Sequence, residues 1–256
     1  MDNDTTEKVI IVTGASRGIG LAITQYLLSE AQCHVVAVAR SEKPLQDLER
    51  DHHQTGRLIT QRGDVADMKF CGQIADETMS RWGRIDGLVV NHGVLDPVKR
   101  ISESFVAEWK EAFDINFFGS LALIKACLPF VKHSRGRIII CSSGAATKAY
   151  STWGAYGASK AVLNHLVQTL AVEEPEVCTI SVRPGIVNTM MQTSIRETHR
   201  QRMDEADAKK FVDLYESGGL LQPEQPGRVM GRLVLNATSD LSGKFIDWQA
   251  PELKAF

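Results

Sequence analysis

The chain has 256 residues, with 29 basic and 31 acidic side chains and a formal net charge of −2. Its 43% hydrophobic and 23% charged residues are typical of one globular domain and exclude the disordered, collagen-like and disulfide-scaffold classes. The near-neutral balance also argues against a nucleic-acid binder, which needs a surplus of Lys and Arg, so a small-molecule partner is expected.

Strand-length apolar runs alternate with longer helical stretches along most of the chain. Several runs, such as residues 9–12 and 138–140, are continuously apolar, which is typical of strands buried on both faces of a parallel sheet. The predicted strands are residues 9–13, 34–39, 57–61, 85–90, 137–141, 177–182 and 244–248. The predicted helices are residues 18–29, 44–52, 67–82, 105–116, 117–132 and 152–173. These βαβ units predict an α/β fold: a single-domain, Rossmann-type doubly wound parallel sheet of about seven strands with helices on both faces.

Residues 190–225 depart from this alternation. The segment is strongly charged, and residues 204–216 have a helical pattern. So long an excursion before the last strand is typical of a substrate lid inserted into the single domain, although a solvated surface helix fits the same sequence. Its apolar residues fit either the inner face of a lid or a packed helical stripe; they are Met190, Met191, Phe211 and Tyr215.

Cysteine and histidine usage suggests neither disulfides nor a metal site. The five cysteines are scattered and form no CxxC pair, which favours a reducing compartment. His52-His53 lacks metal-ligand spacing, so no metal is expected. Residues 1–7 are polar and acidic, unlike a targeting signal, and Lys125 and Pro129 interrupt the most apolar stretch. We therefore expect a cytoplasmic protein without a membrane partner.

A glycine-rich turn follows the first strand directly. Residues 13–20 read TGASRGIG and open an apolar helix. Such glycines let the backbone approach a pyrophosphate, and the helix N-terminus presents free N–H groups to the anion. An empty tight turn would also fit the glycines alone, but the flanking strand and helix favour dinucleotide binding. The expected contacts are Gly14, Ser16, Arg17, Gly18, Ile19 and Gly20.

With this turn the chain resembles the short-chain dehydrogenase/reductase family, whose signature is TGxxxGxG. The resemblance runs from about residue 9 to residue 248. Within the family, residues 114–118, residues 151–156 and the Asn164-His165 pair are similar to sepiapterin-reductase-like and fungal benzil-reductase-like members. Those members reduce dicarbonyls and aromatic ketones with NADPH. The resemblance also implies a homodimer or homotetramer.

The end of the second strand indicates which dinucleotide is bound. Ala39 stands where an NAD-selective site carries an acid for the ribose 2′-hydroxyl, and Arg40 and Ser41 follow it. Arg17, Arg40 and Ser41 together make a forked anion site that favours the 2′-phosphate of NADPH/NADP+. Each arginine alone would fit a solvated surface charge, but their combination with the missing carboxylate favours NADP.

Three further segments match the family's cofactor contacts. Asp64 and Val65 resemble the pair that meets the adenine, although Asp64 equally fits a helix cap. Asn91 and Gly93 match the family's NNAG, whereas His92 departs from it and is expected to pack or hydrogen-bond rather than react. A Pro-Gly turn after the sixth strand resembles the family's PGxVxT, which contacts the nicotinamide, although such turns are common. Its residues are Pro184, Gly185, Ile186, Val187 and Thr189.

A YxxxK pattern carries the strongest indication of chemistry. Tyr156 and Lys160 lie at i and i+4 of a predicted helix, so both side chains share one face. A nearby ammonium favours the phenolate and lowers the pKa of the tyrosine from about 10, which makes it a usable acid or base. Ser143 lies thirteen residues upstream at the end of a strand and is preferred to Ser142 because of that separation.

The resemblance assigns roles to four residues. Tyr156 would donate the proton in a carbonyl reduction, and Ser143 would hydrogen-bond the substrate oxygen. Lys160 would stabilise the ionised form of Tyr156 and would bind the nicotinamide ribose. Asn116, in the family's NxxG, would anchor a water relay to Lys160. Trp153 fits either an aromatic substrate pocket or a buried anchor at the helix start.

The predicted function is NADPH-dependent reduction of a ketone or dicarbonyl, a small-molecule substrate. NADP-dependent alcohol oxidation is the alternative physiological direction, because dehydrogenases run both ways. A non-catalytic NADP(H)-sensing protein is the alternative from another class. Such a protein would be expected to lose the tyrosine or the lysine, and both are present here.

Overall fold

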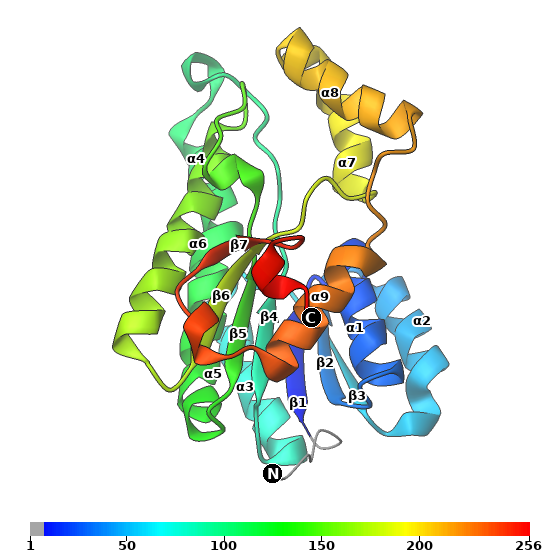
Figure 1. Ribbon diagram of the computed structural model, residues 1–256, viewed down its shortest axis with the longest axis vertical. Coiled ribbons are helices and arrows are strands. Elements are labelled where there is room, and N and C mark those ends of the chain that lie inside the picture. The colour runs from blue at the N-terminus through cyan, green and yellow to red at the C-terminus, as the bar shows by residue number, and fades with distance from the viewer. Residues whose placement is uncertain (1–7) are drawn as a thin grey trace.

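The computed structural model describes residues 8–256, so the expectation for residues 1–7 lies outside the described residues. Within this range, one parallel sheet has the strand order β3-β2-β1-β4-β5-β6-β7 (Figure 1). The predicted fold is confirmed, and each predicted strand appears within two residues of its expected limits. The strands are β1 (Val9–Thr13), β2 (His34–Ala39), β3 (Leu58–Arg62), β4 (Gly87–Val90), β5 (Arg137–Cys141), β6 (Cys178–Arg183) and β7 (Phe245–Asp247).

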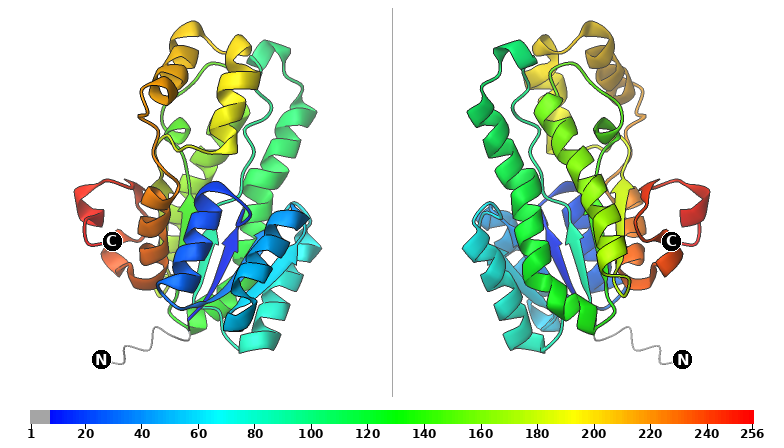
Figure 2. Two further views of the ribbon diagram at one scale, coloured as in Figure 1. Left: turned by 90° about the vertical axis from the view of Figure 1, so that its right-hand side faces the viewer. Right: turned by 90° about the vertical axis from the view of Figure 1, so that its left-hand side faces the viewer.

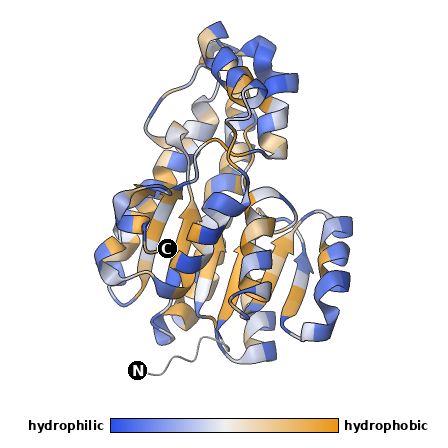
Figure 3. Cartoon of the chain, turned by 45° about the vertical axis from the view of Figure 1, so that its right-hand side comes forward, coloured by the Kyte–Doolittle hydropathy of each residue, from blue (hydrophilic) through white to orange (hydrophobic). Residues whose placement is uncertain are grey.

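Helices cover both faces of this sheet, as the two opposite views in Figure 2 show. One layer contains α1 (Gly18–Ser29), α2 (Glu42–His52) and α9 (Glu224–Asn236), and the other contains α3 (Met68–Trp82), α5 (Ser120–His133) and α6 (Gly154–Glu173). Ile10 and Val12 of β1 pack under the first layer, whereas Ile11 packs under the second. Both faces of the strands are therefore buried, which explains their continuously apolar sequences and their hydrophobic colour in Figure 3.

The two helices predicted over residues 105–132 form one continuous run. Helix α4 (Val106–Phe113) passes through a π-helical turn (Asp114–Gly119) into α5. By length and composition the combined Val106–His133 helix could cross a membrane. The sequence does not predict this, because Lys125 and Pro129 interrupt its most apolar stretch. Leu123 and Ile124 are nevertheless buried against the sheet, as in the core helix of a globular domain.

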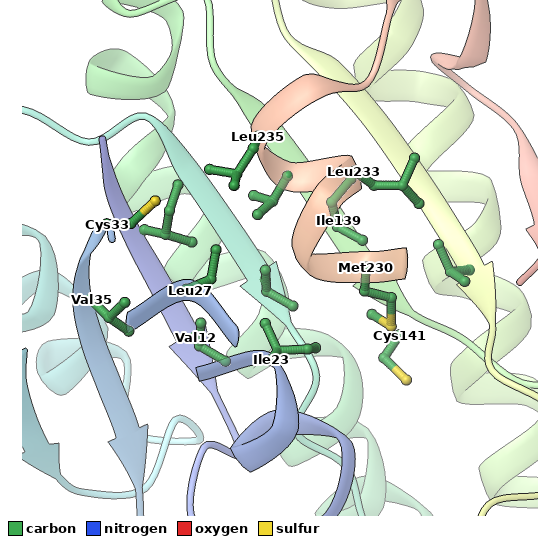
Figure 4. Close-up of a cluster of buried hydrophobic side chains, with 14 of the residues drawn as sticks. Val12, Ile23, Leu27, Cys33, Val35, Ile139, Cys141, Met230, Leu233 and Leu235 are labelled. Carbon is green, nitrogen blue, oxygen red and sulfur yellow. The ribbon is translucent and has the colours of Figure 1, made fainter. Parts of the chain in front are cut away.

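No helix is predicted over residues 224–236, yet α9 is one of the core helices. Pro226, Gly227 and Gly231 give its sequence the character of a loop, but the glycines serve close packing. A Cβ on Gly231 would lie 2.5 Å from Cδ1 of Tyr26 on α1. Figure 4 shows Met230 and other side chains of α9 in the same cluster as those of α1 and the sheet.

The segment after β6 rises above the carboxyl ends of the strands (Figure 1). It contains α7 (Met190–Ser194), a π-helical turn (Ile195–His199) and α8 (Glu205–Glu216), which confirms the helix expected near residues 204–216. Two polar contacts connect it to the loop that follows β4. Arg100 lies 2.6 Å from Asp204, and His199 lies 3.7 Å from Asp96.

Candidate active site

A cavity of about 490 Å³ lies between the carboxyl ends of the strands and the segment of α7 and α8. Parallel sheets place ligands at this edge, where the strand order reverses between β1 and β4. Of the predicted site residues, only Gly20 and Asn116 are absent from its wall. Those that line it are Gly14, Ser16, Arg17, Gly18, Ile19, Arg40, Ser41, Asp64, Val65, Asn91, Gly93, Ser143, Tyr156, Lys160, Pro184, Gly185, Val187 and Thr189.

The glycine turn has the shape that a pyrophosphate requires. Gly14 and Gly18 adopt left-handed φ angles of +64° and +54°, which favour glycine. A Cβ on Gly20 would lie 2.2 Å from the carbonyl oxygen of Gly14, so only glycine lets the two ends of the turn approach this closely. Nδ2 of Asn91 donates to the carbonyls of Thr13 and Gly14 and ties the turn to β4. The residues present therefore fit a dinucleotide.

The end of β2 carries positive charge. Ala39 is buried, and the neighbouring side chain of Arg40 is 56% exposed. Nη1 of Arg40 lies 3.5 Å from Oδ2 of Asp64. Because exposed ion pairs of this length are weak, a phosphate can compete with Asp64 for the guanidinium. Arg17 is also exposed on the same cavity wall.

Tyr156 is buried on α6 and retains its proton. Burial raises the pKa of Tyr156 to about 12, although a hydrogen bond with the hydroxyl of Ser143 acts in the opposite direction. Burial therefore outweighs the expected lowering of this pKa, and the net shift in this structure is upward. Nζ of Lys160 lies 6.0 Å from the tyrosine ring centroid and donates to the carbonyl of Cys141 at 2.9 Å. The phenol is thus protonated at neutral pH, which suits a proton donor.

The two neighbouring serines at the end of β5 have different partners. The hydroxyl of Ser142 donates to Oδ1 of Asn164 at 2.7 Å. The hydroxyl of Ser143 faces Tyr156 and accepts from the backbone N–H of Ala145 at 3.1 Å. Both serines line the cavity, and the preference for Ser143 stays a prediction.

Asn116 lies behind the cavity wall, in the π-helical turn. It is fully buried, accepts from the backbone N–H of Val94 at 2.8 Å, and donates to Val94 O and Ser159 Oγ. A Cβ on Gly93 would lie 3.4 Å from Oδ1 of Asn116 and 3.3 Å from Nζ of Lys160. Asn116 therefore braces the loop after β4 beside Lys160, and its relay role stays a prediction.

His92 joins three parts of the site. Its Nδ1 lies 2.7 Å from the hydroxyl of Thr13, and its Nε2 lies 3.2 Å from the carbonyl of Ile115 and 3.1 Å from Oγ of Ser120. Ser120 donates its own proton to the carbonyl of Asn116, so Nε2 of His92 is the protonated nitrogen. Burial and the charge of Lys160 lower the pKa of His92 to about 3. The expected hydrogen-bonding role of His92 is confirmed.

An aromatic wall forms the substrate end of the cavity. The ring centroids of Tyr150 and Trp153 are 4.8 Å apart, and those of Trp153 and Phe211 are 5.3 Å apart. Trp153 is 6% exposed, lines the cavity and precedes the first residue of α6, so it is a buried anchor at the helix start, and its contact with a substrate stays a prediction. Tyr150 and Lys210 are wall residues that were not expected, because the sequence does not show that α8 folds back over residues 150–153.

The sequence of this chain matches a known protein family and is similar to a yeast enzyme. The family model described as short chain dehydrogenase matches residues 8–200. The chain is 39% identical over 257 residues to benzil reductase ((S)-benzoin forming) IRC24 of Saccharomyces cerevisiae, covering 96% of this chain and 97% of that protein.

Two solved structures from Saccharomyces cerevisiae are also similar. The short chain dehydrogenase/reductase YIR035C has a TM-score of 0.94 at 39% identity, covering 97% of this chain and 99% of that chain. A cytoplasmic protein described as having unknown function has a TM-score of 0.82 at 39% identity, covering 97% and 98% of the two chains.

Proposed function

Because this chain belongs to the short chain dehydrogenase family, we propose that it is an NADPH-dependent carbonyl reductase that converts a ketone or dicarbonyl to the hydroxy compound. The family uses nicotinamide cofactors, which supply a hydride when bound. The observation that carries the proposal is that Ser143, Tyr156 and Lys160 lie together on the wall of the cavity. Similarity to a benzil reductase supports the reduction of a dicarbonyl.

Three side chains of this cavity carry the proton chemistry. Negative charge develops on the substrate oxygen during reduction, and hydrogen-bond donors already in place stabilise it. Tyr156 donates its proton to that oxygen, and Ser143 orients it. The positive charge of Lys160 then stabilises the phenolate that remains. Asn116 acts indirectly, because it holds the loop that packs beside Lys160.

Each group of cofactor residues would bind a different part of the dinucleotide. The glycine turn from Gly14 to Gly20 would hold the pyrophosphate, and Arg17, Arg40 and Ser41 would hold the 2′-phosphate of NADPH. Asp64, Val65, Asn91 and Gly93 would line the adenosine half. The nicotinamide half would meet Lys160 together with Pro184, Gly185, Val187 and Thr189.

The remaining proposals concern the whole chain. Residues 190–225 form a substrate lid within one domain, which is supported by the contacts of α7 and α8 with the cavity. A cytoplasmic location is supported by the similarity to a cytoplasmic yeast protein. A homodimer or homotetramer follows from family resemblance.

Replacing Tyr156 with Phe tests the mechanism. The variant lacks the proton donor, so we expect kcat for benzil to fall by about 10²- to 10⁴-fold. NADPH binding, measured by fluorescence titration, should not change, because the other cofactor residues remain. Near-normal turnover by Tyr156→Phe would overturn the assignment.

A further inference from the structure

The substrate end of the cavity carries a cation that has no carboxylate partner. Lys210 lies on α8 and on the cavity wall. Its Nζ lies 5.7 Å from the ring centroid of Tyr150 and 6.0 Å from that of Phe211, and it donates to the hydroxyl of Tyr150 at 3.3 Å. Over residues 8–256, no carboxylate comes within ion-pair distance of Lys210. Its neighbour Lys209 is off the wall and pairs with Asp213 at 2.7 Å.

Aromatic rings connect this cation to the reacting end of the cavity. The ring centroids of Tyr156 and Trp153 are 6.1 Å apart, and Trp153 also contacts Phe211 and Tyr150. An aromatic substrate lying along these rings with its carbonyl at Tyr156 would direct its far end towards Lys210. The reacting carbonyl of such a substrate would contact Tyr156, whereas its far end would contact Lys210.

The charges around this end favour an anion. Lys148 lies 5.0 Å from the ring centroid of Tyr150 but is not a residue of the cavity wall, so Lys210 is the ammonium that faces the cavity at this end. Asp96 is an acidic residue of the same wall, and its exposed carboxylate makes no ion pair with Lys210. Cation–π contacts keep the Lys210 ammonium close to the rings that the substrate would contact.

We propose that Lys210 is a specificity residue that selects aromatic carbonyl compounds carrying a carboxylate at the end remote from the reacting carbonyl. The inference rests on the proposed function and names its substrate class. The reaction is unchanged: the carbonyl carbon gains the hydride, its oxygen gains the proton of Tyr156, and the remote carboxylate is neither formed nor consumed. The ammonium of Lys210 donates to that carboxylate.

Direct binding of a ligand that cannot be reduced tests the inference separately from catalysis. 4-Benzylbenzoate and 4-benzylbenzamide have the same shape, lack a ketone and differ in charge. By calorimetry, the unmodified protein should bind the anion about fivefold more tightly than the amide, as expected for a partly exposed ion pair. Lys210→Met should abolish the preference. Lys209→Met removes the same charge from the same helix but should keep the preference.

The opposite results would overturn the inference. Equal affinity of the unmodified protein for the anion and the amide would do so, as would a preference that survives in Lys210→Met or is lost equally in Lys209→Met. Both lysines are exposed, so neither substitution removes core packing, and thermal unfolding of each variant checks that the fold is intact.

Reduction of 4-carboxybenzil and of its 4-carboxamide by NADPH separates the inference from the proposed function. The unmodified protein should favour the acid over the amide in kcat/KM, and Lys210→Met should lose that preference. Absence of NADPH oxidation with either diketone would contradict the proposed function. If the binding preference persists in that case, the assignment of Lys210 to anionic ligands still stands.

Discussion

At the scale of single residues, burial determines which groups around the cavity are charged. Removal from water disfavours the ionised form, so the pKa of Tyr156 rises to about 12 and that of His92 falls to about 3. Burial lowers the pKa of Lys160 as well. A YxxxK spacing places the lysine and the tyrosine on one helical face, but it does not reveal that Nζ of Lys160 is held by the Cys141 carbonyl.

Cofactor preference is tested at Arg40. In Arg40→Asp a carboxylate would face the 2′-phosphate, so kcat/KM for NADPH should fall by about 10- to 100-fold while the value for NADH changes little. Arg62→Asp is the matched control, since Arg62 ends β3, pairs with Glu42 and lies off the cavity wall. An unchanged ratio of the two kcat/KM values in Arg40→Asp would show that the 2′-phosphate lies elsewhere.

At the scale of elements, α9 shows why local sequence signals misplace a helix. Glycine and proline usually end helices because they cost helical free energy in isolation. Here Gly227 and Gly231 let α9 approach α1, and the buried side chains of Met230, Leu233 and Val234 offset that cost. The benefit depends on α1, which lies about two hundred residues earlier in the chain.

Two glycine substitutions test this explanation. A Cβ on Gly231 would collide with Tyr26, so Gly231→Ala should lower the free energy of unfolding by about 1–2 kcal/mol. Gly72 lies within α3, where a Cβ would meet nothing within 4 Å, so Gly72→Ala should raise that free energy by up to about 1 kcal/mol. Urea unfolding of both variants gives the values, and stabilisation by Gly231→Ala would contradict the close packing.

At the scale of the whole molecule, the cavity depends on segments from all parts of the chain. The glycine turn, the loop after β4, the end of β5, the start of α6 and the segment after β6 each contribute a wall. His92 connects β1, β4 and the π-helical turn by hydrogen bonds. Its protonation is therefore expected to affect the stability of the entire fold.

Unfolding of the whole chain should depend on pH through His92. The folded pKa of about 3 lies below the ordinary value of 6.5, so on acidification the unfolded chain binds a proton before the folded chain does. Above pH 6.5 this group has no effect, and between pH 6.5 and 3 it reduces stability by about 1.4 kcal/mol per pH unit.

Comparison with His92→Gln isolates this effect. Glutamine hydrogen-bonds without titrating, so between pH 7 and pH 5 the unmodified protein should lose about 2 kcal/mol more of its unfolding free energy than the variant loses. Urea unfolding at both pH values measures the difference. Equal losses would mean that His92 accepts a proton in the folded state.

The strand limits, the glycine turn, the Ser143–Tyr156–Lys160 set and the family could all be predicted from the sequence. These features depend on local pattern: continuous apolar runs, a turn between a strand and a helix, and spacing along one helix. The tertiary structure decided the helical state of α9, the buried position of Asn116, the raised pKa of Tyr156 and the placement of Lys210 over the aromatic wall. Packing, burial and hydrogen bonding between residues distant in the chain determine these properties, so no local pattern contains them.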